Sequence, residues 1–155
     1  MTTSMGEIRR AWVPDAETVA ALLHDFNTEF ETATPGVGVL TTRLRTLLAG
    51  PDLVALLHGD PPDALAVVSF RPNAWSDAPV ALLDELYVRP DRRGQRIGHA
   101  LLAAVEALAA ERGGRLVEVN VDGEDVDARR FYAAHGYRHV EPGAAEPSYY
   151  YAKEW

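Results

Sequence analysis

Residues 80–98 read VALLDELYVRPDRRGQRIG, in which an apolar run with two acidic residues is followed by a polar loop rich in arginine. The run over 80–88 has the composition of a central strand, and apolar residues at helical spacing from Ile97 onward predict a helix over 95–112. The loop between them therefore leads from a strand into the first turn of a helix. Several backbone N–H groups and the positive end of the helix would then face one point, which favours a phosphate site.

The residues of this loop also fit an anion site. Gly94 and Gly98 allow the backbone to approach a ligand closely, and Pro90 stiffens the exit from the strand. Four of the 15 basic residues of the chain fall within the eight positions 89–96, although the formal net charge is -8. Such a concentration of arginine in an acidic protein predicts anion binding. The alternative, a solvated arginine-rich turn, is weaker because basic side chains are unfavourable at a helix N-terminus.

Hydrophobic spacing and turn residues predict the remaining elements. Before the central strand we expect a strand at 7–13, a helix at 16–30, a short helix that Thr41 caps and Gly50 stops, and a hairpin of strands at 53–58 and 64–70. After the long helix we expect a strand at 115–121, a short helix that ends near Gly136, and two closing strands at 137–141 and 148–155. This order, β-α-α-β-β-β-α-β-α-β-β, predicts an α/β fold with a mixed, mostly antiparallel central sheet flanked by helices. Only the crossover through the long helix requires a parallel pair of strands.

The composition indicates a globular protein, because 47% of the 155 residues are hydrophobic and 25% are charged; this length fits a single domain over 1–155. Cysteine is absent and the five histidines show no ligand spacing, so we expect no metal site. We find no signal peptide and no stretch of the ~20 apolar residues that a membrane helix needs, so we expect a cytoplasmic protein with no membrane partner. The negative charge argues against a nucleic-acid partner.

Two segments resemble motifs of one enzyme superfamily. The segment R-G-Q-R-I-G at 93–98, after a strand that ends V-R-P, is similar to the cofactor signature [QR]-x-x-G-x-[GA] of the GCN5-related N-acetyltransferase (GNAT) superfamily. Arg96 stands where the central glycine is usual. The segment A-R-R-F-Y-A-A-H-G-Y at 128–137 is similar to the second motif, A-x-x-[LF]-Y-x-x-x-G-[FY], and Asp125 stands where an asparagine is common. The two motifs lie at matching spacing, so together they are far more specific than either alone.

The resemblance implies a GNAT-like fold over the whole chain, acetyl-CoA (coenzyme A) as co-substrate, and no metal. It also implies cofactor contacts through the backbone N–H groups that hold the oxyanion and through the residues of both motifs. These residues are Leu86, Tyr87, Val88, Arg93, Gly94, Gln95, Arg96, Ile97, Gly98, Asp125, Arg129 and Tyr132. Tyr132 matches the tyrosine that serves the family as general acid toward the leaving thiolate; the alternative is an aromatic side chain that fills the core beside Phe131.

The chemistry also requires a base, because an amine with a pKa of ~10.4 must lose a proton before it attacks a thioester. Asp84 and Glu85 are the candidates. Adjacent residues of a strand point to opposite faces, so we expect only one of them to face the substrate, and we favour Glu85. The alternative is that both acids form ion pairs at the sheet surface.

The acceptor is expected to be a small cationic amine, such as a polyamine or an aminoglycoside. Asp122 and Glu124 lie in an acidic loop, whose alternative role is a solvated loop with a helix-capping acid. Glu29, Glu31 and Trp75 lie on loops that commonly shape the acceptor pocket in similar proteins, where they would add cation and aromatic recognition.

Two other functions remain open. One is an acetyltransferase for a protein N-terminus or a lysine side chain. The other is an acyl-CoA-binding sensor without catalysis, prompted by Arg96 and Asp125. The aromatic segment 148–155 would either pair with a partner chain, giving a homodimer, or complete the chain's own sheet.

Overall fold

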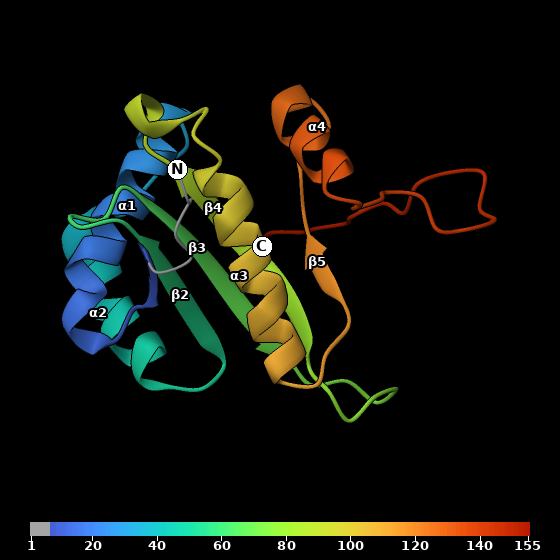
Figure 1. Cartoon of the computed structure of the whole chain (residues 1–155), viewed down its shortest axis with the longest axis horizontal. Coiled ribbons are helices and arrows are strands. Elements are labelled where there is room, and N and C mark those ends of the chain that lie inside the picture. The colour runs from blue at the N-terminus through green and yellow to red at the C-terminus, as the bar shows by residue number, and fades with distance from the viewer. Residues whose placement is uncertain (1–6) are drawn as a thin grey trace. The chain divides into compact units, whose positions relative to one another are not determined.

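The computed structural model describes residues 7–155. In chain order it contains β1 (Ile8–Arg10), α1 (Ala16–Glu29), α2 (Val37–Ala49), β2 (Leu53–His58), β3 (Ala64–Arg71), β4 (Val80–Val88), α3 (Ile97–Glu111), β5 (Val117–Val119) and α4 (Val126–Ala134), with 3-10 turns at Val13–Asp15 and Pro90–Arg92 (Figure 1). The expected order is thus confirmed from the first strand through the last helix.

The five strands form one sheet in the order β1-β2-β3-β4-β5. The first four strands pair antiparallel, each with the next one along the chain. β4 and β5 are parallel, with Ala81 opposite Val117 and Leu83 opposite Val119. They are joined through α3, so the single parallel crossover that the sequence predicts is confirmed.

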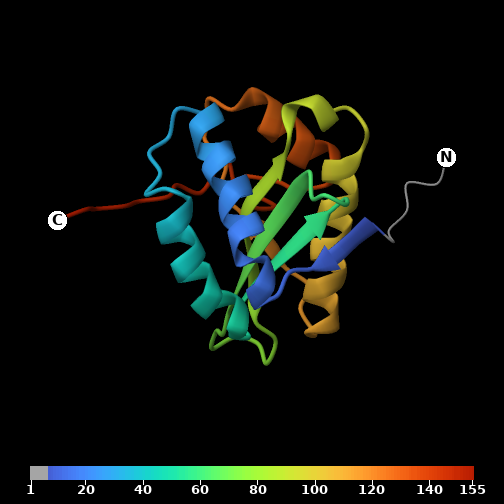
Figure 2. The same cartoon turned by 90° about the vertical axis from the view of Figure 1, so that its left-hand side faces the viewer.

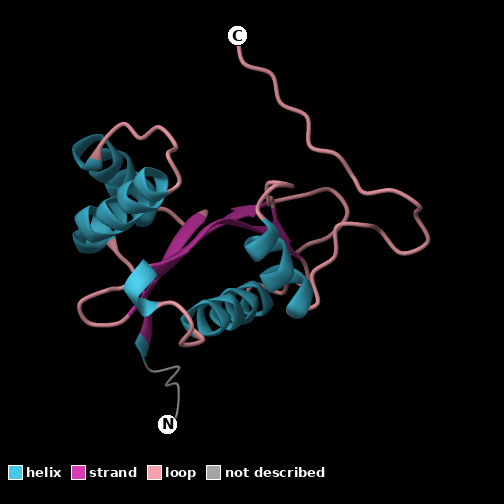
Figure 3. Ribbon diagram, turned by 90° about the horizontal axis from the view of Figure 1, so that it is seen from above, coloured by secondary structure: helices cyan, strands magenta, loops and turns pink. Residues whose placement is uncertain are grey.

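Helices cover both faces of the sheet. α1 and α2 lie on one face and α3 lies on the other (Figures 1 and 3), and Figure 2 shows the first face, with α1 and α2 in front of the strands. Under α1 and α2 the core contains buried side chains from both helices and from alternate strand positions, among them Val19, Leu22, Leu44, Leu48, Ala55, Leu57, Leu65, Val67 and Tyr87. α3 buries Ile97, Leu101, Leu102 and Val105. We therefore call the two sides the α1/α2 face and the α3 face.

The second helix begins earlier than the sequence predicts. α2 starts at Val37, after Gly36 in a left-handed conformation (φ 95°) that glycine adopts readily. Thr41 is therefore inside the helix, where its hydroxyl donates to the carbonyl of Val37 at 2.7 Å. The expectation that Thr41 caps this helix is wrong, because Gly36 supplies the turn instead.

The chain divides into two compact units, residues 1–119 and residues 120–155. The second unit contains α4, and no strand follows it over 137–155. The prediction of two closing strands is therefore wrong for this structure. A strand exists through its hydrogen-bonded partner, and within residues 7–155 no strand pairs with this segment. Its three adjacent tyrosines are 68%, 79% and 87% exposed.

None of the helices within residues 7–155 combines the length and apolar character required to cross a bilayer.

Candidate active site

β4 contains a bulge at its two acidic residues. Val67 of β3 pairs with Glu85, whereas the next residue, Val68, pairs with Leu83, so Asp84 is an extra residue without a partner in the ladder. A bulge of this kind breaks the alternation of side chains along a strand.

Both acids therefore lie on the α1/α2 face. Glu85 is opposite Val67, which belongs to the core under α1 and α2. Asp84 accepts a hydrogen bond from the hydroxyl of Ser69, which is two positions beyond Val67 and so on the same face of β3. The expectation that the two neighbours point to opposite faces is wrong here, because the extra residue shifts the alternation by one.

The surroundings of Glu85 make it a better proton acceptor near neutral pH than an ordinary carboxylate. Burial raises the pKa of Glu85, and the neighbouring negative charge of Asp84 raises it further. Within residues 7–155 neither acid forms a salt bridge. The alternative that Asp84 and Glu85 form ion pairs at the sheet surface is therefore wrong for the described residues.

The second half of β4 has no paired strand on the side of β5, and we call this unpaired side of the strand its open side. Pairing between β4 and β5 ends at Leu83 and Val119, and in the described chain no strand pairs with residues 84–88 on that side. The N–H of Arg89 donates to the carbonyl of Asp63 at 2.9 Å. Because ladder bonds alternate along an antiparallel pair, the N–H groups of Leu86 and Val88 point away from β3. They face the open side, whereas that of Tyr87 faces β3.

Tyr87 instead contributes a buried side chain. Its ring stacks on Phe26 of α1 at 4.9 Å between centroids, and its hydroxyl donates to Glu29 at 3.2 Å. Burial and the charge of Glu29 raise the pKa of Tyr87, so its hydroxyl stays protonated at neutral pH. Glu29 also accepts two hydrogen bonds from Arg93, at 2.8 and 2.9 Å. A predicted acceptor residue and a predicted cofactor residue are thus in direct contact.

The loop after β4 combines left-handed backbone with N–H groups that have no protein acceptor within residues 7–155. Gly94 (φ 77°) and Arg96 (φ 62°) both adopt the left-handed conformation, and Arg96 is the N-cap of α3. In the described part of the chain the N–H groups of residues 94–98 donate to no protein acceptor. Left-handed residues among successive N–H groups are typical of backbone nests that bind anions. We use the name phosphate nest for residues 94–98, and their binding of an anion stays a prediction. The left-handed φ of Arg96 also explains why glycine is usual at this position in the family motif.

Most of the arginine side chains near the nest are engaged by the protein. Arg89 contacts Asp25 at 3.0 Å, Arg92 contacts Asp63 at 2.8 Å, and Arg93 contacts Glu29 at 2.8 Å. Arg96 is exposed and forms no salt bridge within residues 7–155. Three of the four arginines of the loop thus contact carboxylates, whereas Arg96 forms no such pair within residues 7–155. The anion-binding role of the loop stays a prediction.

The predicted residues of the second unit are described within that unit alone. Asp125 accepts a hydrogen bond from the N–H of Ala128 at 3.0 Å and caps α4, and Arg129 donates to the carbonyl of Gly123 at 3.1 Å. Tyr132 packs edge-on against Phe131, with ring centroids 5.1 Å apart. The roles of Asp125, Arg129 and Tyr132 toward a cofactor stay predictions.

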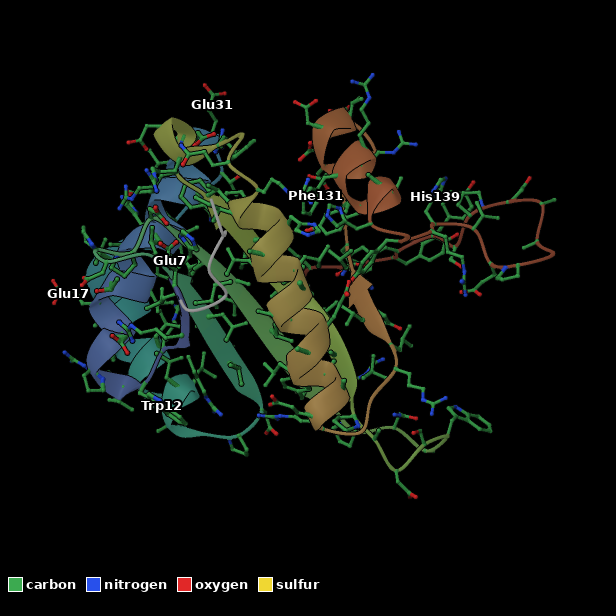
Figure 4. All side chains as sticks on the ribbon, viewed as in Figure 1. Glu7, Trp12, Glu17, Glu31, Phe131 and His139 are labelled. Atoms are coloured by element: carbon green, nitrogen blue, oxygen red, sulfur yellow. The ribbon has the colours of Figure 1, made fainter. Side chains whose placement is uncertain are left out.

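The other predicted acceptor residues are exposed. The side chain of Glu31 projects outward beyond the end of α1 (Figure 4), and Trp75 is 95% exposed. Asp122 and Glu124 are exposed as well. Their roles toward an acceptor stay predictions.

Sequence reasoning missed two groups that the fold brings to this region. Ser69 reaches Asp84 across 15 positions of sequence, and Asp63 reaches Arg92 across 29. Both contacts depend on the register of β3 and β4, for which no local sequence pattern gives a signal. Ser69 also lines an open groove of about 400 Å³ beside the end of α2, together with Thr46, Leu47, Gly50, Pro51, Asp52, Leu53 and Phe70.

Metal ligands are not grouped in this structure: within residues 7–155 no set of three His, Asp or Glu side chains is placed to hold an ion.

Comparison with known proteins identifies relatives of this chain. A family model described as the acetyltransferase (GNAT) family matches residues 19–137. The aminoalkylphosphonate N-acetyltransferase of Salmonella typhimurium is 43% identical over 56 residues, which are 36% of this chain and 36% of that protein. The aminoglycoside N(6')-acetyltransferase type 1 of Stenotrophomonas maltophilia is 36% identical over 69 residues, 44% of this chain and 45% of that protein. The matches span less than half the length of these curated relatives.

Solved structures are similar over nearly the whole chain, and one of them is also similar in sequence. A crystal structure of a "putative acetyltransferase" from Arthrobacter sp. FB24 is 61% identical, with a TM-score of 0.91. The match covers 96% of this chain and 95% of that one.

Proposed function

Because the chain belongs to the acetyltransferase (GNAT) family, we propose that it transfers an acetyl group from acetyl-CoA to a primary amine of a small cationic molecule. One observation carries the proposal: the bulge in β4 places Asp84 and Glu85 on one face, in the strand that leads directly to the phosphate nest. A proton acceptor and an anion site are then supplied by one continuous segment of the chain.

The phosphate nest fits the pyrophosphate of coenzyme A. Its N–H groups have no protein acceptor in the described residues, and two left-handed residues lie among them, as in backbone nests that bind anions. The exposed guanidinium of Arg96 would add a charge-assisted hydrogen bond. Acetyl-CoA supplies an activated thioester. The N–H groups of Leu86 and Val88, on the open side of β4, would hold the acyl oxygen and stabilise the negative charge that develops there.

Glu85 is proposed as the base that takes the proton from the acceptor's ammonium group, directly or through a water molecule. Its raised pKa brings the carboxylate closer to neutral pH, which favours proton transfer. Asp84 adds a second negative charge that would attract the cationic amine. The chain contains no cysteine, so a cysteine-bound acyl group is excluded and direct attack by the amine is proposed. Tyr132 is proposed, from the family resemblance, as the acid that protonates the leaving thiolate.

A cationic acceptor is supported by the charges on the α1/α2 face. Asp84 is bonded to Ser69, which lines the groove beside α2, and Asp52 lines that groove too. The names of two relatives specify small amines: an aminoglycoside, which is cationic, and an aminoalkylphosphonate, whose amine is accompanied by an anionic phosphonate. We therefore propose polyamines and aminoglycoside-like amines as the first acceptors to test. We also propose that the protein acts in the cytoplasm.

The test is release of free thiol from acetyl-CoA with a panel of polyamines, aminoglycosides and short lysine peptides. A protein without cysteine contributes no thiol of its own. Release that depends on a polyamine or an aminoglycoside supports the proposal, and Tyr132→Phe should then slow it. If thiol is released only with the lysine peptides, the function is acetylation of proteins. Saturable binding of coenzyme A without any release would favour the sensor function, and absence of binding would contradict both.

A further inference from the structure

The turn between β2 and β3 holds the loop that precedes the phosphate nest. The carboxylate of Asp63 accepts a hydrogen bond from Nε of Arg92 at 2.8 Å, and the carbonyl of Asp63 accepts one from the N–H of Arg89 at 2.9 Å. Asp63 therefore contacts both ends of the segment 89–92, which forms the 3-10 turn between β4 and the nest. The side chain of Asp63 is only 15% exposed, so the contact with Arg92 is partly shielded from solvent.

His58 fixes the Asp63 carboxylate from the interior. Its side chain is 3% exposed, and its Nδ1 lies 2.6 Å from the second oxygen of Asp63. Its Nε2 lies 3.0 Å from the carboxylate of Glu7, which Figure 4 labels. Both ring nitrogens of His58 thus contact carboxylates, one of them that of Asp63. The backbone adds a further bond, from the N–H of Asp63 to the carbonyl of His58 at 2.9 Å.

The phosphate nest needs support of this kind because part of it is strained. Arg96 is a non-glycine residue in the left-handed conformation, which costs about 1 kcal/mol or more relative to an ordinary helical conformation. A strained backbone persists only where surrounding contacts hold it. The side chains that hold the preceding segment 89–92 in the described chain are Asp25, through Arg89, and Asp63, through Arg92.

We propose that Asp63, oriented by His58, is a positioning residue for the cofactor's phosphates: it holds the 89–92 turn so that the N–H groups of the nest converge. The proposal rests on the proposed function, because it needs the nest to bind coenzyme A. It goes beyond that function in assigning a role to a buried His–Asp pair that takes no part in proton transfer.

Electrostatics and positioning make opposite predictions for the removal of this acid. Asp63 carries a negative charge close to an anion site, so neutralising it should strengthen coenzyme A binding if charge alone mattered. If Asp63 acts by positioning, the same change should weaken binding. Asp91 is the matched control, because it lies in the same turn and is exposed, and it forms no salt bridge or side-chain hydrogen bond within residues 7–155.

The experiment is calorimetric titration of the full chain with coenzyme A, for the wild type, Asp63→Asn and Asp91→Asn. We expect Asp63→Asn to raise the dissociation constant for coenzyme A about tenfold. This factor corresponds to the loss of one charge-assisted hydrogen bond that holds the turn in its binding conformation. Asp91→Asn should bind as the wild type does or more tightly. In steady-state assays Asp63→Asn should raise KM for acetyl-CoA and leave kcat within about twofold.

The proposal is overturned if Asp63→Asn binds as tightly as Asp91→Asn. If Asp63→Asn does not fold, Arg92→Lys replaces it, because lysine keeps the charge and loses the Nε donor that contacts Asp63; binding equal to that of the wild type would then overturn the proposal. If the wild type itself fails to bind coenzyme A, the proposed function has failed, and the inference falls with it. These outcomes separate a failure of the inference from a failure of the function.

Discussion

Glu29, the last residue of α1, and Arg93, in the loop after β4, are joined through both carboxylate oxygens, which lie 2.9 and 2.8 Å from one guanidinium nitrogen. Glu29 also accepts the hydroxyl of Tyr87. The end of α1, the buried face of β4 and the entrance to the phosphate nest are thus connected by one carboxylate. A change of conformation at the end of α1 would therefore alter the position of Arg93, which directly precedes the phosphate nest.

Replacement of Glu29 tests the strength of this connection. Because the side chains of Arg93 and Glu29 are 44% and 28% exposed, solvent screens the pair, and we expect Glu29→Gln to lower the free energy of unfolding by less than about 1 kcal/mol. Urea denaturation measures the difference. Glu31→Gln is the control, since Glu31 is exposed and bonds neither Arg93 nor Tyr87, and it should leave stability unchanged. A loss above about 2 kcal/mol would show that the pair is stronger than this account holds.

The two left-handed residues of the nest predict opposite responses to substitution. Arg96→Gly should raise the free energy of unfolding, by up to about 1 kcal/mol, since relief of left-handed strain exceeds the added entropy of the unfolded chain. Gly94→Ala should lower it by about 1 kcal/mol. At Gly94 no atom lies within 4 Å of an added Cβ, so strain rather than a clash would be the cause. Thermal unfolding of both variants checks the signs, and equal signs would contradict the assigned backbone conformations.

The raised pKa of Glu85 predicts how its effect on stability depends on pH. The folded protein holds this proton more tightly than the unfolded chain, whose ordinary value is 4.5. The stabilising contribution of Glu85 is therefore fully present below that value and is lost as pH rises through the raised folded pKa. Glu85→Gln cannot ionise, so relative to the wild type it should be more stable at about pH 8 than at about pH 4. A difference from the wild type that stays constant between these pH values would contradict the raised pKa.

Asp84 is the second cause of that raised pKa, and its removal should be visible in activity. With Asp84→Asn the pKa of Glu85 falls, so the acidic limb of the kcat profile should move to lower pH. The pH dependence of kcat at saturating substrates measures this shift. Glu118→Gln, which removes an acid from β5 outside the site, should leave the limb in place. If the acidic limb does not move with Asp84→Asn, the charge of Asp84 does not influence the pKa of the catalytic base.

The sequence predicts the sheet and its two long helices well, because apolar side chains recur at the spacing of these elements. The strands at 53–58, 64–70 and 80–88 and the helices at 16–30 and 95–112 agree with the structure to within two residues at each end. The closing strands were predicted from the aromatic residues of 148–155, but strand formation depends on a partner, which a local pattern does not contain.

The sequence proposes residue types for a site but not their geometry. The pair Asp84–Glu85 and the segment 93–98 were proposed from sequence and stay predictions, whereas the bulge could not be predicted, because it is a property of the register between β3 and β4. The ion pairs of Arg92 and Arg93 with distant acids were unpredicted for the same reason. The acidic loop shows the opposite case, since the sequence offers a helix-capping acid there as an alternative role and Asp125 caps α4 in the structure.

The most direct test of the central claim is the rate of thiol release by Glu85→Gln, measured at saturating acetyl-CoA and the best acceptor of the panel, at about pH 7.5. Glu111→Gln, at the exposed end of α3, serves as the control. We predict that Glu85→Gln lowers kcat about 100-fold or more, as expected for loss of a general base, while coenzyme A binding and the control remain unchanged. A kcat for Glu85→Gln within twofold of the wild type would contradict the assignment of Glu85 as the base.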